Sequence, residues 1–340
     1  MRSPDSVGSA EADLAELVLT CVALDPALDL LRSTGLRIDV IYPADDPHTA
    51  ILSQGDQRVR LTERPDAPPP STELPPFSPR LVVTRAGTAA NAGRAGMSYR
   101  DLIPDRLGGR YVASHITIHQ AGPVADWIHF HRVGLQMLAV RSGWVRVVYE
   151  DQGDPFVMHS GDIVLQPPGI RHRVLESSAG FEVIEIGCPA LHETFADHEL
   201  ELPNCQGEAS RLFGGQHFLF HRAEETAWTR FGAAEAQQTA MRAATGGLAD
   251  VRIIRPRQSD RIEFPQHDGE LMFGFVLSGN GRLDVADGHA IGPADAFVIP
   301  PDVPWALDAI SADFRLLHLT TTNLPATLPA IDRPSHAESA

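Results

Sequence analysis

Two stretches of the chain repeat one pattern at a separation of about 135 residues, which is typical of a duplicated domain. RSGWVRVVY (141–149) corresponds to LSGNGRLDV (277–285), and DIVLQPPGIRH (162–172) corresponds to DAFVIPPDVPW (295–305). A chain of 340 residues has room for two domains of roughly 150 residues and a smaller third unit. The repeat therefore predicts two similar domains, at residues 80–200 and 201–325.

Short apolar runs in both copies are separated by turn-forming residues. The chain has 28 glycines and 27 prolines, many of them between runs only a few residues long. This spacing favours short strands joined by tight turns over helices. We expect a mainly β protein, with small polar tails at 1–13 and 326–340 that are disordered.

The segment 14–63 has a different pattern. ELVLTCVAL predicts a strand, Asp25 and Pro26 predict the start of a helix, and three more strand-like runs follow. This βαβββ order resembles a half-module of the glyoxalase, or vicinal-oxygen-chelate, superfamily. Its first strand lacks the histidine of metal-binding members, although Glu63 lies near their glutamate position, so we expect a structural α+β module. The proline-rich segment 64–79 predicts a stiff linker.

Three histidines in the first copy have a spacing that suits a shared site. His129 and His131 are two residues apart in a strand-like run, so their imidazoles point to one face. Gln136 begins the next strand, and the turn around Gly169 brings His172 onto a neighbouring strand. We expect the three imidazoles and the amide to converge inside a barrel.

These residues resemble the two motifs of the cupin superfamily. The first motif, G(X)5HXH(X)3–4E(X)6G, corresponds to Gly122, His129, His131, Gln136 and Gly143, with six residues before the first histidine. The second motif, G(X)5PXG(X)2H, corresponds to Gly161, Pro167, Gly169 and His172. The resemblance implies two double-stranded β-helix (jelly-roll) barrels, a bicupin, with one divalent metal ion held by His129, His131, Gln136 and His172 in the first.

Gln136 stands where the family has a glutamate. An amide oxygen can bind a metal but adds no negative charge, so the ion would keep its full charge and favour an anionic or chelating substrate. We expect iron, with zinc, manganese, nickel and cobalt as alternatives. A hydrogen bond from Gln136 to a histidine, outside the ligand set, is the other possibility.

The second copy keeps the frame without the ligands. The four ligand positions align with Pro265, His267, Met272 and Trp305. One imidazole does not hold a divalent ion against water, so we expect a degenerate, metal-free barrel in which Glu270 is the nearby carboxylate.

Other residues of the first copy are candidate pocket walls. Trp127, Leu138 and Val174 each lie two residues from a proposed ligand, which predicts that they line the metal cavity. Glu182 and Glu185 cannot both face inward, because their separation is odd. The sequence leaves open which of the two does so.

The net charge and the cysteines restrict the binding partners and the cellular compartment that we expect. The net charge of −16 disfavours nucleic acid and anionic membranes, and no apolar run is long enough to span a bilayer. Cys21, Cys188 and Cys205 show no paired spacing, which fits a reducing cytoplasm. For the module 14–63 we favour a homodimer, because half-modules of this type work in pairs; the outer face of its own two barrels is the alternative partner.

Several activities are compatible with this site. The resemblance implies a metal-dependent enzyme, and family prevalence favours a dioxygenase acting on a small enolisable, phenolic or carboxylate substrate. A metal-dependent isomerase, cyclase or lyase and a non-catalytic small-molecule-binding cupin are the alternatives.

Overall fold

The computed structural model of the chain describes residues 16–92, 96–204, 208 and 210–331. Contacts divide the chain into two units, residues 1–69 and 70–340. The predicted tail 1–13 and residues 332–340 of the second predicted tail lie outside the described residues. Each unit is described by itself.

The N-terminal unit has the predicted βαβββ order. Its elements are β1 (Glu16–Thr20), α1 (Leu24–Ser33), β2 (Arg37–Tyr42), β3 (Thr49–Gln54) and β4 (Gln57–Thr62). β1 is parallel to β4, whereas β3 is antiparallel to both β4 and β2.

The start of α1 differs from the prediction. The residue before the helix is Ala23, and the carboxylate of Glu63 accepts a hydrogen bond from the backbone N–H of Leu24. Asp25 therefore lies inside the first turn and does not cap the helix. Glu63 has a structural contact here.

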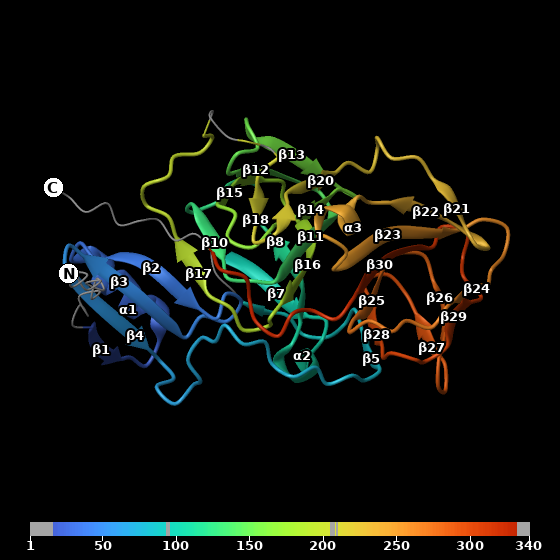
Figure 1. Cartoon of the computed structure of the whole chain (residues 1–340), viewed down its shortest axis with the longest axis horizontal. Helices are drawn as coiled ribbons and strands as arrows, with labels where there is room; N and C mark the ends of the chain where they lie inside the picture. Colours follow the sequence, from blue (N-terminus) through green and yellow to red (C-terminus); the bar gives the residue numbers. More distant parts are fainter. Residues whose placement is uncertain (1–15, 93–95, 205–207, 209, 332–340) are drawn as a thin grey trace, which may run out of the picture. The chain divides into compact units, whose positions relative to one another are not determined.

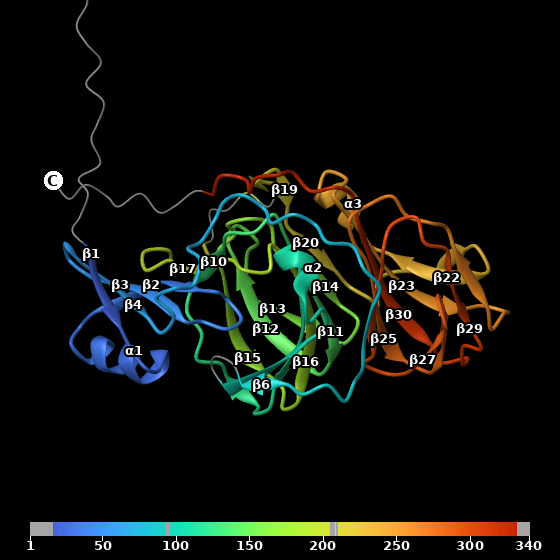
Figure 2. The ribbon, with the colours of Figure 1, turned by 90° about the horizontal axis from the view of Figure 1, so that it is seen from below.

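Residues 70–331 contain two β-barrels, which lie side by side in both views (Figures 1 and 2). In the first barrel one sheet contains β17, β10, β15, β12 and β13 in this order, with β9 paired to β15, and the facing sheet has the order β20-β14-β11-β16-β8-β7-β6. Their bounds are β6 (Asn91–Ala92), β7 (Met97–Asp101), β8 (Val112–Ile118), β9 (Gly122–Pro123), β10 (His129–His131), β11 (Leu135–Ser142), β12 (Trp144–Tyr149), β13 (Phe156–His159), β14 (Ile163–Leu165), β15 (His172–Ser177), β16 (Phe181–Cys188), β17 (Thr194–Ala196) and β20 (Leu219–His221).

The second barrel repeats this arrangement with sheets β21-β22-β23-β30-β25-β28-β5 and β24-β29-β26-β27. The bounds are β5 (Val82–Thr84), β21 (Thr229–Phe231), β22 (Ala234–Gln238), β23 (Ala249–Pro256), β24 (Ile262–Phe264), β25 (Met272–Ser278), β26 (Gly281–Asp284), β27 (His289–Ile291), β28 (Ala296–Ile299), β29 (Trp305–Asp308) and β30 (Arg315–Thr321). Short elements outside these sheets are α2 (Arg106–Gly109), α3 (Met241–Ala244) and the hairpin β18 (Leu212–Phe213) with β19 (Gln216–His217). The mainly β, two-barrel fold is thus confirmed.

Alternation along the strands separates the barrel interiors from the contact between barrels. In β11, Leu135, Met137 and Ala139 belong to a core shared with β23, β25 and β30 of the second barrel. The intervening residues Leu138 and Val140 belong to the interior cluster of the first barrel. Because side chains alternate between faces, Gln136 also faces this interior.

Three predicted boundaries do not match the contacts in the structure. β5 lies in the segment assigned to the first barrel but pairs with β28 of the second, and β20 lies in the segment assigned to the second but pairs with β14 of the first. Of the predicted C-terminal tail, Leu328 is buried and donates its N–H to Thr72 O at 2.8 Å.

The predicted linker is only partly a free connection. Its residue Ser78 donates its N–H to Leu107 O at 3.1 Å, and the ring of Phe77 packs edge-on against Tyr111. The second half of the proline-rich segment therefore packs on the barrels, because its apolar side chains contact buried residues there.

Candidate metal centre in the first barrel

Three histidines from two adjacent strands meet in the first barrel. His129 and His131 lie at the ends of β10, and His172 begins β15, directly opposite His129 in the antiparallel register. All three are buried, and one possible ligand atom from each lies within 4.8 Å of the others. The ring centroids are 4.3–5.3 Å apart. The two-residue spacing and the turn at Gly169, where φ is +79°, produce this meeting.

The histidine hydrogen bonds fit the tautomer that metal binding requires. Nδ1 of His129 lies 2.7 Å from Trp127 O, and Nδ1 of His172 lies 3.1 Å from Ile170 O. A carbonyl only accepts, so these Nδ1 atoms carry the proton and Nε2 carries the lone pair. Nδ1 of His131 lies 3.0 Å from the Thr194 hydroxyl, which can accept in the same way.

A carboxylate supports this arrangement from outside the triad. Asp126 Oδ1 lies 3.5 Å from Nδ1 of His129, and Asp126 Oδ2 accepts the N–H of Val174 at 2.9 Å. Carboxylate and carbonyl partners behind the ring orient a ligating imidazole and raise its basicity. The donor set therefore fits a divalent metal ion, and the triad could hold one.

Gln136 is buried and bonded to a carboxylate on the adjacent strand. Its Nε2 donates to Glu185 Oε1 at 2.6 Å, and Gln136 is opposite Gly187 in the β11–β16 register. Because the N–H₂ group of Gln136 donates to Glu185, the amide oxygen is the atom that remains available to a metal. The structure thus places Gln136 inside the barrel, with its N–H₂ group on Glu185.

The register also decides between the two glutamates. Glu185 faces the interior, whereas Glu182 points to the opposite face, where it contacts His115 at 2.8 Å and forms an ion pair with Arg141. Burial raises the pKa of Glu182, but Arg141 and His115 lower it more, so it lies below its usual value. Glu185 is the inward carboxylate that the sequence did not identify.

One of the predicted pocket walls, Trp127, packs against the triad. The Trp127 ring lies 5.2 Å from the His129 ring, edge to face. Leu138 and Val174 pack with the interior cluster of the first barrel. Tyr149, which sequence reasoning did not single out, stacks 5.5 Å from His172 and receives a hydrogen bond from Gln166 at 2.8 Å. Burial raises the pKa of the Tyr149 phenol, which stays neutral.

His192 is a fourth imidazole beside the triad. It follows β16, is 5% exposed, and its ring centroid lies 5.4 Å from that of His131. His192 could not be singled out from the sequence, because the segment CPALHETF has neither strand periodicity nor motif spacing.

The second barrel is filled with aromatic residues at the corresponding place. Phe264 pairs with Trp305 as His129 pairs with His172, so the counterpart of His129 is Phe264 and not Pro265. The two aromatic rings stack at 3.9 Å. Across the described part of the chain, the His129, His131 and His172 cluster is the one group with metal-ligand geometry.

The remaining candidates of the second barrel have structural contacts. His267 Nε2 lies 2.9 Å from Ile299 O. Glu270 forms a buried bidentate pair with Arg110 at 2.7 and 2.9 Å and accepts a hydrogen bond from the Tyr111 hydroxyl. Glu270 is therefore not a pocket carboxylate, because it joins the two barrels.

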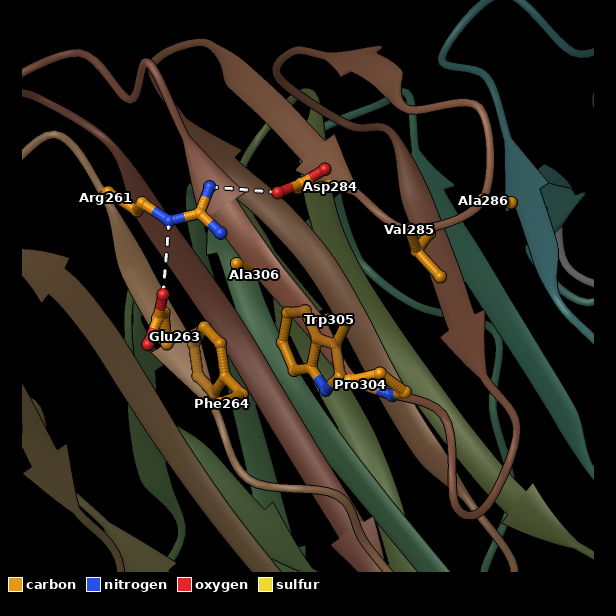
Figure 3. A pocket seen from close by; sticks show the side chains of 9 residues that line it. All are labelled: Arg261, Glu263, Phe264, Asp284, Val285, Ala286, Pro304, Trp305 and Ala306. Carbon is orange, nitrogen blue, oxygen red and sulfur yellow. Dashed lines mark hydrogen bonds and ion pairs between the residues drawn. The ribbon is translucent and has the colours of Figure 1, made fainter.

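A pocket of about 490 Å³ lies on the second barrel (Figure 3). Arg261 is paired there with Glu263 and Asp284, above the stacked Phe264 and Trp305. These carboxylates already have a cation, and no histidine lines the pocket. We assign no function to it.

Comparison with known proteins supports the fold. No family model and no curated protein sequence gives a significant match. Among solved structures, oxalate decarboxylase from Bacillus subtilis has 14% identity and a TM-score of 0.53, covering 76% of this chain and 80% of that chain. A putative glyoxylate-induced protein from Pseudomonas aeruginosa has 13% identity and a TM-score of 0.54, covering 75% and 94%. YlbA from E. coli has 15% identity and a TM-score of 0.50, covering 74% and 94%.

At these identities the likeness establishes the fold alone. Residues 70–331 have the bicupin fold, and the cupin resemblance of the two sequence motifs is confirmed at that level. Within the described residues, no helix has the length and apolar character needed to cross a membrane.

Proposed function

We propose that the protein is a metal-dependent bicupin enzyme whose first barrel binds one divalent ion through His129, His131 and His172. The observation that carries the proposal is the meeting of three buried imidazoles, two of which must carry their proton on Nδ1 and so present Nε2 as a ligand atom. Gln136 would supply a weak fourth ligand through its amide oxygen, while Glu185 holds its N–H₂ group.

Ligand charge favours a particular class of substrate. Three neutral imidazoles and an amide leave the ion with its full positive charge, which attracts an anionic or chelating small molecule. Iron is the metal that we propose first, and zinc, manganese, nickel and cobalt suit the same ligands. Trp127, Leu138 and Val174 would provide apolar walls that limit water around the bound substrate.

Dioxygenation of a small enolisable, phenolic or carboxylate substrate is the reaction that we propose. A bound metal with few protein ligands supplies open positions for a chelating substrate and O₂ together. The protein would position the substrate between the triad and the apolar walls, and the walls would exclude competing water. The separate cysteines and the acidic charge fit a cytoplasmic enzyme.

A second candidate is an isomerase, cyclase or lyase that uses no net O₂. Glu185 favours it, because a carboxylate that faces the interior of the same barrel can accept or return a proton. The similarity to oxalate decarboxylase adds carboxylate cleavage to the reactions worth testing.

Oxygen uptake distinguishes the candidates. Purified protein loaded with Fe²⁺ or Mn²⁺ is screened against diketones, phenols and small carboxylates, with His131→Ala as the matched control. Uptake with turnover supports the dioxygenase. Turnover without uptake supports the second candidate, and tight binding without turnover would show a non-catalytic binding protein instead. Activity that persists in His131→Ala would contradict the proposed site.

A further inference from the structure

The imidazole of His192 has a buried nitrogen for which the described part of the chain offers no hydrogen-bond partner. His192 is 5% exposed, and its Nε2 has no hydrogen-bond partner among the residues that the structure describes. Its Nδ1 lies 2.9 Å from Pro189 O, so Nδ1 carries the proton and Nε2 is an acceptor. An unsatisfied buried acceptor destabilises the folded protein. A ligand that donates a hydrogen bond would remove this destabilisation.

The position of His192 connects it to the candidate metal centre. Its ring is perpendicular to that of His131, with 5.4 Å between centroids. Gly187 faces the same interior space as Gln136, and a Cβ atom on Gly187 would lie 3.8 Å from Cε1 of His192. Because 3.8 Å is an ordinary van der Waals distance, the imidazole of His192 packs against the interior face of β16 at Gly187, next to His131.

His192 is beside the ligand set and not part of it. The group of ligand atoms that all lie within 4.8 Å of one another contains His129, His131 and His172, without His192. A molecule bound to an ion in the triad would lie within reach of the His192 imidazole on the side of His131. Glu185, the inward carboxylate, already accepts from Gln136.

We propose that His192 Nε2 accepts a hydrogen bond from a hydroxyl group of the metal-bound substrate. This inference rests on the proposed metal-dependent function and narrows its substrate class. The substrate would offer one anionic oxygen to the metal and carry a separate O–H group, as in a 2-hydroxycarboxylate, or an enol or a phenol that also bears a carboxylate. A fully ionised dicarboxylate has no O–H group and would leave Nε2 unsatisfied.

A matched pair of probes tests this assignment. Glycolate and methoxyacetate have the same carboxylate and the same second oxygen, but only glycolate has an O–H group. Each is titrated into Co²⁺-loaded full-length protein while the visible spectrum of the ion is followed. We expect wild-type protein to prefer glycolate by about 10-fold, the effect of one hydrogen bond to a buried acceptor.

Two variants separate hydrogen bonding from structure. His192→Phe should bind Co²⁺ normally and lose the preference, whereas His192→Gln, whose amide oxygen can accept near the Nε2 position, should regain part of it. Equal affinities in the wild type, an unchanged preference in His192→Phe, or loss of Co²⁺ from both variants would overturn the assignment. If wild-type protein binds no Co²⁺, the proposed function itself fails, which is a different result from metal binding without the preference.

Discussion

Replacing Gln136 by glutamate would put a second carboxyl group at the 2.6 Å contact with Glu185. Gln136 is 2% exposed, so water would screen the two charges poorly. Two like charges about 4 Å apart repel by about 4 kcal/mol at the effective dielectric constant of a protein. In metal-free protein the pair should therefore keep one proton near neutral pH, and its pKa should rise above the usual carboxyl range.

The sign of the pH dependence follows from this raised pKa. The stability of the variant is fully present at low pH, where the shared proton makes a hydrogen bond, and is lost as pH rises through the folded-state pKa. We expect its unfolding free energy to fall below that of the wild type by about 2–4 kcal/mol between pH 5 and pH 8. Urea denaturation of chelator-treated protein measures the difference.

A control and a metal titration complete this test. Gln166→Glu makes the same chemical change directly after β14, where the side chain contacts the Tyr149 hydroxyl, which can donate to the new carboxylate, so its pH profile should stay close to that of the wild type. Added divalent metal should remove the difference in unfolding free energy between Gln136→Glu and the wild type. The variant should bind the metal more tightly than the wild type does and should bind anionic probes more weakly. If the unfolding free energies of Gln136→Glu and wild-type protein change with pH in the same way, the contact between residues 136 and 185 is refuted.

Three further predictions concern stability and assembly. Glu270→Gln leaves the buried Arg110 charge without its partner and should lower the unfolding free energy by about 3 kcal/mol in urea without changing metal content; unchanged stability would refute the role of this pair. Burial lowers the pKa of His318 to about 3, so acid should destabilise the protein below pH 6.5 by up to about 1.4 kcal/mol per pH unit. His318→Phe should remove this sensitivity to acid. Equal acid sensitivity of the variant and the wild type would contradict the lowered pKa. We propose that the N-terminal module pairs with the same module of a second chain. Sedimentation should then show a dimer of the full-length chain and, after deletion of residues 1–69, a monomer that still binds metal. A monomeric full-length chain would exclude the dimer.

Local patterns in the sequence were sufficient for the triad. His129 and His131 share a face because side chains alternate along any strand, and this holds without knowledge of the neighbours. His172 follows a glycine turn of defined length. Strands, turns and the duplicated frame depend on the same short-range rules, which is why the mainly β two-barrel fold could be predicted.

Long-range pairing accounts for what the sequence did not reveal. The choice between Glu182 and Glu185 depends on the β11–β16 register, and a shift of one residue would exchange the faces. β5 and β20 each pair with the barrel on the other side of a predicted boundary, which no local pattern encodes. His192 lies in an irregular segment, where no periodicity indicates the direction of a side chain.

Metal content tests the central claim most directly. Wild-type protein and His131→Ala are purified without added metal, offered Fe²⁺, Mn²⁺, Zn²⁺, Co²⁺ and Ni²⁺ in turn, and analysed for bound metal, with circular dichroism as the check on folding. The proposed site predicts one ion per wild-type chain and loss of that ion from a folded His131→Ala. Equal metal in both proteins, or none in the wild type, would contradict it.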